Sequence, residues 1–138
     1  RRAVTVATRE LREGIATTSD GAYRLIASRE RATGALVFPP TTRPGWDEVV
    51  LPAVGELFSH SRVEMASPHF PAGYAVGVVE FALEDSRVLV FGQLRGPAGH
   101  DYRIGERVET VETALWTESG DSGEVEVRGF AFAPEAGR

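Results

Sequence analysis

The stretch that decides the fold is residues 74–91, YAVGVVEFALEDSRVLVF. Its first ten residues are almost continuously apolar, which predicts a strand with both faces buried. The polar residues at 84–87 make a tight connection, and the apolar run at 88–91 predicts the next strand. These two strands indicate a mainly β protein.

Three further strands flank this pair. They are predicted at residues 54–65, 106–117 and 124–130, and the last two are joined by the turn sequence SGDSG at 119–123. Five short strands bounded by turns in about 80 residues favour a small closed barrel. A five-stranded OB-fold over residues 54–134 is the leading interpretation, and a small sandwich is the alternative.

Two shorter parts precede the barrel. Residues 1–29 are predicted to form an N-terminal arm, in which Thr8 caps a helix over 10–16 and a strand covers 22–28. Residues 30–53 have too few apolar side chains for a core of their own, so this part must pack against the rest of the chain.

Composition excludes several kinds of chemistry. The chain has 138 residues and a net charge of -5, with no Cys, Lys or Asn. Thiolate nucleophiles, thiolate metal sites and Schiff-base or phosphate-loop lysines are therefore excluded. The acidic balance disfavours a general nucleic-acid binder.

The sequence also bears on location. No apolar run approaches the roughly 18 residues of a membrane helix, and no signal peptide is visible. We expect a cytoplasmic protein. The chain starts at Arg1, so we expect it to be trimmed or cut from a longer polypeptide.

Five short motifs occur in an order that resembles a known family. They are Gly34 with Phe38-Pro39-Pro40, then GELFSH at 55–60, GYAVGVVE at 73–80, YRIGERV at 102–108 and FAP at 132–134. Together they span about residues 22–134. In their order and spacing the chain resembles the zinc-ribbon/OB-fold acyl-CoA-associated family, of the domain of unknown function 35 type. The resemblance implies a rubredoxin-like ribbon ahead of an OB barrel.

The four ribbon positions lack the cysteines that bind zinc in that family. They are Glu30, Thr33, Arg43 and Trp46. None is a thiolate, and one carboxylate does not make a tetrahedral zinc site. The resemblance therefore implies a degenerate ribbon without metal, in which Trp46 fills the vacated centre and Glu30 pairs with Arg43. We expect no zinc and no other resident cofactor.

The resemblance also implies a partner. Members of the family accompany thiolase-superfamily enzymes, such as thiolases, hydroxymethylglutaryl-CoA synthases and steroid side-chain retro-aldolases of lipid or steroid metabolism. The chain is thus expected to be a non-catalytic accessory subunit or domain in a hetero-oligomer, and not an enzyme on its own. An acyl-CoA thioester is expected only at an interface shared with the partner.

An alternative function comes from the barrel itself. OB-folds bind single-stranded nucleic acid through stacking aromatics on their second and third strands. Phe81 and Phe91 lie on those predicted strands. Aromatics at such positions are more often core residues, so a nucleic-acid-binding module is the less favoured hypothesis.

The histidines offer two weaker hypotheses. His60 and His69, with Glu64, are candidates for a metal site across a hairpin. Ser59, His60 and Asp101 are candidates for a nucleophilic triad, although no nucleophile-elbow pattern surrounds the serine. The simpler interpretation is that His60, His69 and His100 are polar surface residues.

The loop at residues 66–73, ASPHFPAG, is the predicted contact region for a partner or ligand. Its prolines restrict the unfolded chain, so less entropy is lost when the loop is ordered. His69, Phe70 and the following Tyr74 are the candidate contact residues. Phe70 is expected either to anchor a partner or to fold back into the barrel mouth.

Overall fold

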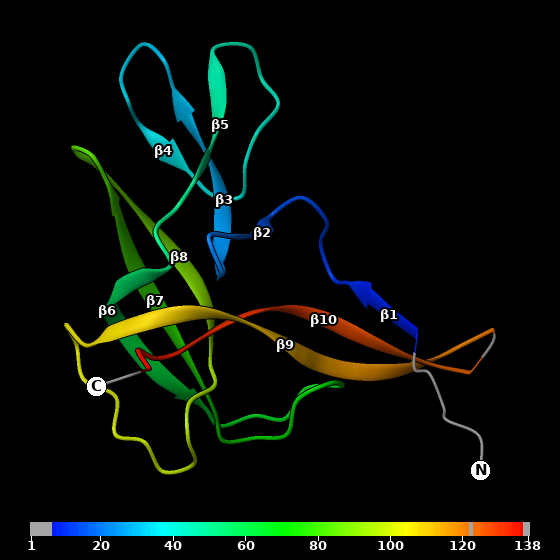
Figure 1. Ribbon diagram of the computed structural model, residues 1–138. Coiled ribbons are helices and arrows are strands. Elements are labelled where there is room, and N and C mark those ends of the chain that lie inside the picture. Colours follow the sequence, from blue (N-terminus) through cyan, green and yellow to red (C-terminus); the bar gives the residue numbers. More distant parts are fainter. Residues whose placement is uncertain (1–6, 122, 137–138) are drawn as a thin grey trace.

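The computed structural model describes residues 7–121 and 123–136. These residues form ten strands, and no helix among them is long and apolar enough to cross a membrane. Figure 1 shows a barrel built from the later strands, with a smaller sheet from the earlier part of the chain standing above it.

The barrel contains five strands. They are β6 (Val54–Val63), β7 (Tyr74–Leu83), β8 (Ser86–Leu94), β9 (Arg107–Gly120) and β10 (Gly123–Pro134). The strand order is β6-β7-β8-β10-β9, and pairing of β9 with β6 closes the barrel. Strands β8 and β10 are parallel where Leu94 pairs with Phe132. The predicted closed barrel of the OB type is confirmed. The sandwich alternative is wrong because the five strands form one closed sheet and not two facing sheets.

The core follows from the alternation along the strands. Inward-facing residues such as Val79, Val90 and Val108 are buried, while their chain neighbours face outward. The rings of Phe81 and Phe132 lie 5.9 Å apart at the centre. Because Phe81 is fully buried, it cannot stack on a nucleic-acid base, which removes one of the two aromatics of the nucleic-acid hypothesis.

The smaller sheet is centred on β3 (Ala22–Glu30). It pairs with β2 (Ala16–Ser19), β4 (Leu36–Val37) and β5 (Trp46–Val50). The buried side chains of Leu25, Ala27 and Leu51 join the same apolar cluster as the barrel residues. The segment before the barrel therefore packs against the barrel core, as its composition predicts. The division of the chain at residues 29/30 and 53/54 stays a prediction.

The predicted helix over residues 10–16 is wrong. Instead β1 (Ala7–Glu10) runs parallel to β10, with Ala7 opposite Val125. The backbone N–H of Leu11 donates to the carbonyl of Arg128 at 2.8 Å. Gly14 has a φ of 79°, which a right-handed helix does not allow. Backbone pairing with a distant strand therefore outweighs the weak local capping signal.

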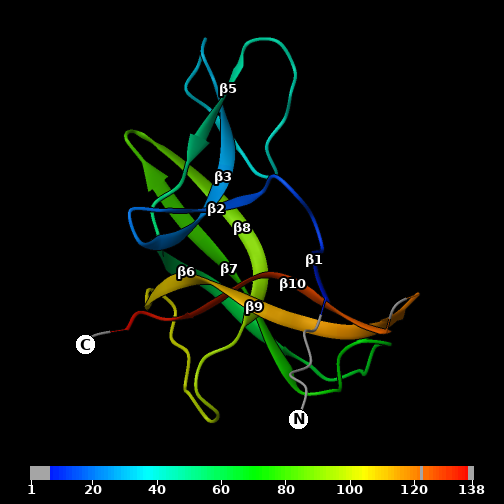
Figure 2. The same ribbon diagram turned by 45° about the vertical axis from the view of Figure 1, so that its right-hand side comes forward.

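The hairpin of β9 and β10 continues past the barrel, with β1 alongside its outer part. Figures 1 and 2 show this extension from two directions. It carries the ring of Trp116, described below.

Candidate functional site

The loop at residues 95–106, between β8 and β9, lies at one end of the barrel. Two backbone hydrogen bonds tie its end to β6. The N–H of Gly105 donates to the carbonyl of Leu57 at 2.7 Å, and the N–H of Leu57 donates to the carbonyl of Glu106 at 2.8 Å. The backbone at the end of the loop is thus held against the barrel wall.

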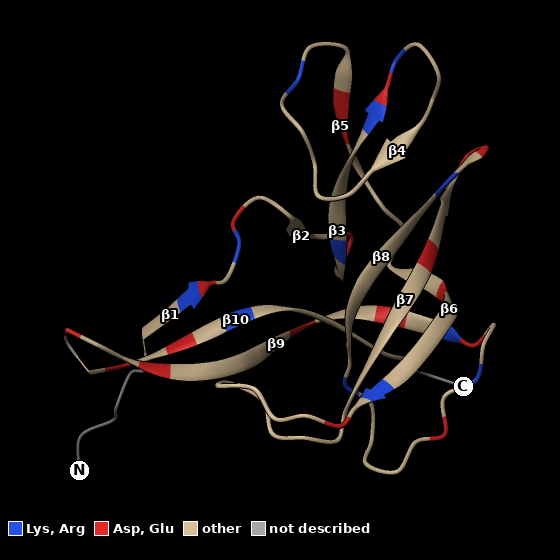
Figure 3. Ribbon diagram, turned by 180° about the vertical axis from the view of Figure 1, so that it is seen from behind, with Lys and Arg blue, Asp and Glu red and all other residues tan. Residues whose placement is uncertain are grey.

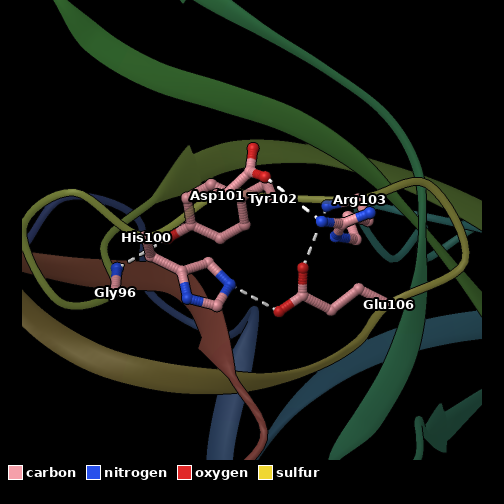
Figure 4. Close-up of polar contacts among 6 residues, drawn as sticks. All are labelled: Gly96, His100, Asp101, Tyr102, Arg103 and Glu106. Carbon is pink, nitrogen blue, oxygen red and sulfur yellow. Dashed lines mark hydrogen bonds and ion pairs between the residues drawn. The ribbon is translucent and has the colours of Figure 1, made fainter.

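The start of the loop is held by Tyr102. The backbone N–H of Gly96 donates to the Tyr102 hydroxyl at 2.8 Å (Figure 4). A Cβ atom at Gly96 would lie 2.5 Å from the Pro134 ring and 2.6 Å from that hydroxyl. Glycine is therefore required here for the close approach of the two segments.

His100 and Glu106 form the central polar pair of this loop. His100 Nε2 and Glu106 Oε2 lie 2.6 Å apart (Figure 4). The other carboxylate oxygen accepts a hydrogen bond from the backbone N–H of Arg103 at 3.0 Å. The imidazole also lies edge-on to the Tyr102 ring, with centroids 4.6 Å apart. A carboxylate in this position fixes the imidazole and favours a proton on Nε2, which leaves Nδ1 able to accept one.

His100 and Tyr102 line a cavity of about 300 Å³ at the barrel mouth. Its lining comes from β6, from β7 and from the loop: His60, Ser61, Arg62, Ala75, His100, Asp101 and Tyr102. Burial raises the pKa of Tyr102, opposed in part by the hydrogen bond from Gly96. A protonated phenol, imidazoles and a guanidinium can hold a polar or anionic group and transfer a proton. We call this cavity the mouth site.

The structure contradicts the weaker hypothesis of a metal site at His60, His69 and Glu64. The structure places the His60 ring 6.4 Å from the Tyr102 ring, and the His69 ring 4.1 Å from the Trp116 ring. Within residues 7–121 and 123–136, no three His, Asp or Glu side chains group closely enough to hold a metal ion. The hairpin turns the two histidines toward different neighbours.

The proposed triad is brought together only in part. His60 and Asp101 line the mouth site, but Ser59 is not among its lining residues. His60 and Ser59 are adjacent in β6, so their side chains leave the strand in different directions. Sequence reasoning missed Glu106, the actual partner of a histidine in this loop. The sequence signal that could have identified this pair is that His100 and Glu106 lie six residues apart in one loop, which must fold back on itself.

The candidate contact residues of the loop at 66–73 form one aromatic cluster. His69 stacks on Trp116 with ring centroids 4.1 Å apart and planes 8° apart. Phe70 lies edge-on to Trp116 at 5.8 Å and 5.4 Å from the Tyr74 ring. Trp116 was not among the predicted contact residues. Phe70 packs within this cluster on the β9–β10 hairpin, and a partner contact through His69, Phe70 or Tyr74 stays a prediction.

The four ribbon positions have contacts unlike those of a zinc site. Glu30 accepts a hydrogen bond from the Thr33 hydroxyl at 2.6 Å. The guanidinium of Arg43 lies 5.7 Å from the centre of the half-buried Trp46 ring, whereas the prediction paired Arg43 with Glu30. A guanidinium and an indole do not ligate zinc, and one carboxylate with one hydroxyl is not a structural zinc donor set. These residues therefore do not fit the metal of the resembled family.

Comparison with solved structures finds a similar fold in the Ltp2-ChsH2(DUF35) aldolase. The TM-score is 0.56 and the sequence identity is 24%, over 80% of this chain and 84% of that chain. No family model matches the sequence, and no curated protein matches it.

The comparison corrects one prediction. The sequence predicts that the chain is not an enzyme on its own. The comparison contradicts this prediction, because the protein of similar fold is an enzyme, an aldolase. At this level of identity the likeness establishes the fold. The chain shares its fold with a chain of the Ltp2-ChsH2(DUF35) aldolase.

Proposed function

We propose that the chain is a component of an enzyme of the DUF35 aldolase type. In this proposal it works in a hetero-oligomer with a thiolase-superfamily protein that cleaves or forms carbon–carbon bonds in acyl-CoA thioesters. The observation that carries the proposal is the fold likeness to the Ltp2-ChsH2(DUF35) aldolase over 80% of the chain. The five ordered sequence motifs support the same family.

The chemistry of the mouth site is consistent with such a reaction. In retro-aldol cleavage, a base removes the proton of a hydroxyl group, the carbon–oxygen bond becomes a carbonyl, and the neighbouring carbon–carbon bond breaks. The released electron pair forms an enolate, which then takes up a proton. His100, oriented by Glu106, and the protonated Tyr102 are groups of this chain that can carry a proton at one cavity.

The complex is tested with the thiolase-superfamily protein encoded nearest to this chain in its own genome. The two proteins are purified separately and mixed, and the mass of the product is measured by light scattering. We expect one stable complex that cleaves a β-hydroxyacyl-CoA thioester faster than the partner alone. Separate elution, or a cleavage rate unaffected by this chain, would contradict the proposal.

A pair of variants tests the mouth site in the same assay. We expect His100→Gln to lower kcat by about 10-fold or more, since a positioned acid or base contributes roughly 10²–10⁴-fold. The control is Glu64→Gln, an exposed residue that does not line the mouth site. Equal kcat for the two variants would remove His100 from the reaction and leave the complex itself untouched.

A further inference from the structure

The outer side of the barrel carries an apolar surface on β6, β7 and β8. Val78 on β7 pairs with Phe91 on β8, and on its other side it pairs with Ser59. Phe58 lies next to Ser59 where the register of β6 shifts. Residues directly opposite one another on paired strands project from the same face of the sheet. We call the surface formed by Phe58, Val78, Leu89 and Phe91 the Phe91 face.

Much of this surface is open to solvent. Phe91 is 65% exposed, Phe58 53% and Leu89 47%. Taking about 150–250 Å² for a large apolar side chain, these three expose roughly 300 Å² together. A contiguous apolar patch of about 300 Å² is comparable to the largest patch on a typical monomer, which is often functional, whereas single exposed apolar residues need no explanation.

The Phe91 face leads into a recess. Phe91 also lines a cavity of about 370 Å³ between the barrel and the smaller sheet. The cavity walls include Leu11 and Leu115, and Phe38 meets Phe130 edge-to-face with centroids 5.8 Å apart. The recess is mainly apolar, and Glu10, Arg12 and Arg128 also line it. Anchor side chains at interfaces contribute most where they fill such a pocket.

The border of the face is acidic. Glu56 and Glu80 pair across β6 and β7, and Glu84 and Asp85 form the turn between β7 and β8. Figure 3 shows acidic residues on β6 and β7 beside the uncharged middle of β8. Arg87 and Arg29 offset part of this charge through ion pairs with Glu80 at 3.4 Å and with Glu84 at 2.7 Å. Arg107 on β9 lies opposite Glu56 in the register of β6 and β9. The four carboxylates and three guanidiniums leave the border with a small net negative charge, which favours a protein surface that carries Arg or Lys around an apolar centre.

Charge argues against a second copy of this chain. A twofold arrangement on this face would bring the acidic borders of the two copies together. A stable interface buries about 800 Å² on each partner, well above the roughly 300 Å² exposed by the three large side chains. A partner must therefore also cover the adjoining cavity and the border around the face.

We propose that the Phe91 face and the cavity beside it are the docking surface for a protein partner. The partner presents an apolar surface bordered by basic side chains and inserts one bulky apolar side chain into the cavity. The identity of this partner as a thiolase-superfamily protein rests on the proposed function. The surface is separate from the mouth site and from the aromatic cluster of His69, Phe70 and Tyr74.

The test uses the double variant Leu89→Thr/Phe91→Thr and two matched controls. Threonine suits a strand, and both replaced side chains are largely exposed, so the barrel is expected to fold normally. The controls are Met65→Thr and Ile104→Thr, which remove apolar side chains that are 79% and 71% exposed outside the face. Circular dichroism and thermal unfolding check that all three variants are folded.

Affinity for the thiolase-superfamily protein encoded nearest to the chain is measured by titration calorimetry. We expect the double variant to raise Kd by about 30-fold or more, as loss of interface anchors does, and each control by less than about 3-fold. We expect Glu56→Lys to weaken binding most strongly at low salt, because it reverses one charge of the acidic border. Protection of residues 86–94 from hydrogen–deuterium exchange in the wild-type complex gives a readout that does not depend on any variant.

The outcomes separate the two proposals. If the wild-type chain binds but the double variant binds equally well and 86–94 gains no protection, the docking surface is wrong and the proposed function stands. If the wild-type chain does not bind this partner, both the docking surface and the proposed function are contradicted. If light scattering shows a wild-type dimer that the double variant abolishes, a second copy occupies the face and the proposed docking surface is overturned.

Discussion

Replacing Gly96 with alanine tests how the barrel mouth is built. The new Cβ would lie 2.5 Å from the Pro134 ring and 2.6 Å from the Tyr102 hydroxyl, both far inside van der Waals contact. Gly96 does not have a left-handed φ, so the effect comes from these contacts rather than from backbone strain. Overpacking of this kind costs about 1–3 kcal/mol. Displacing Tyr102 also loses its hydrogen bond from Gly96, about 1 kcal/mol more.

The free energy of unfolding should therefore fall by about 2–4 kcal/mol, measured by urea denaturation. For a domain of this size, each kcal/mol lowers Tm by roughly 3–5 °C. Tyr102→Phe removes one of the two close contacts, so the double variant Gly96→Ala/Tyr102→Phe should lose less stability than the sum of the single variants.

The control is Ala98→Ser, an exposed position in the same loop, which should stay within about 0.5 kcal/mol of the wild type. A Gly96→Ala protein as stable as this control would refute the close approach of the loop to β10. Strictly additive effects of Gly96→Ala and Tyr102→Phe would show that the hydroxyl is not part of the contact.

Three further predictions concern other parts of the molecule. Burial raises the pKa of Tyr23 to about 12, whereas a tyrosine in an unfolded chain ionises near pH 10. The protonated phenol of Tyr23 therefore stabilises the fold fully below about pH 10, and this contribution is lost as the pH rises toward 12. Urea denaturation at a series of pH values should show a shallower alkaline loss of stability for Tyr23→Phe, and identical profiles would contradict this. Phe70→Ala should lower the stability of the isolated chain by about 1–3 kcal/mol, because Phe70 packs on Tyr74 and Trp116, and an unchanged Tm would show that these contacts contribute nothing. Metal analysis of protein purified without chelator should find no stoichiometric zinc, and zinc that survives dialysis would refute the degenerate ribbon.

Much of the barrel could be predicted from local sequence pattern. In β8 the inward Val88 and Val90 alternate with the outward Leu89 and Phe91, and that alternation is a property of the strand itself. Turn residues likewise mark where one strand ends and the next begins. Such signals extend over a few residues and do not depend on what lies on the other side of the barrel.

Where local signals compete with distant partners, the sequence is a poor guide. The segment after Thr8 has a capping residue and acidic side chains, yet residues 7–10 pair with β10, more than 100 residues away. The hydrogen bonds of that pairing depend on the position of the β9–β10 hairpin, which only the closed barrel fixes.

The site residues show the same difference between what local sequence predicts and what the tertiary structure decides. The sequence predicted a constrained loop that contains His69 and Phe70 and leads into Tyr74, and a partner contact through these residues stays a prediction. Trp116, the shared neighbour of His69 and Phe70, lies in a strand more than 40 residues later, and no spacing rule connects it to them. His100 and Glu106 are close in sequence, but their 2.6 Å contact exists because hydrogen bonds to β6 bend the loop back. Residue type and alternation are local properties, whereas the meeting of two side chains depends on closure of the barrel, in which strands from both ends of the domain share one core.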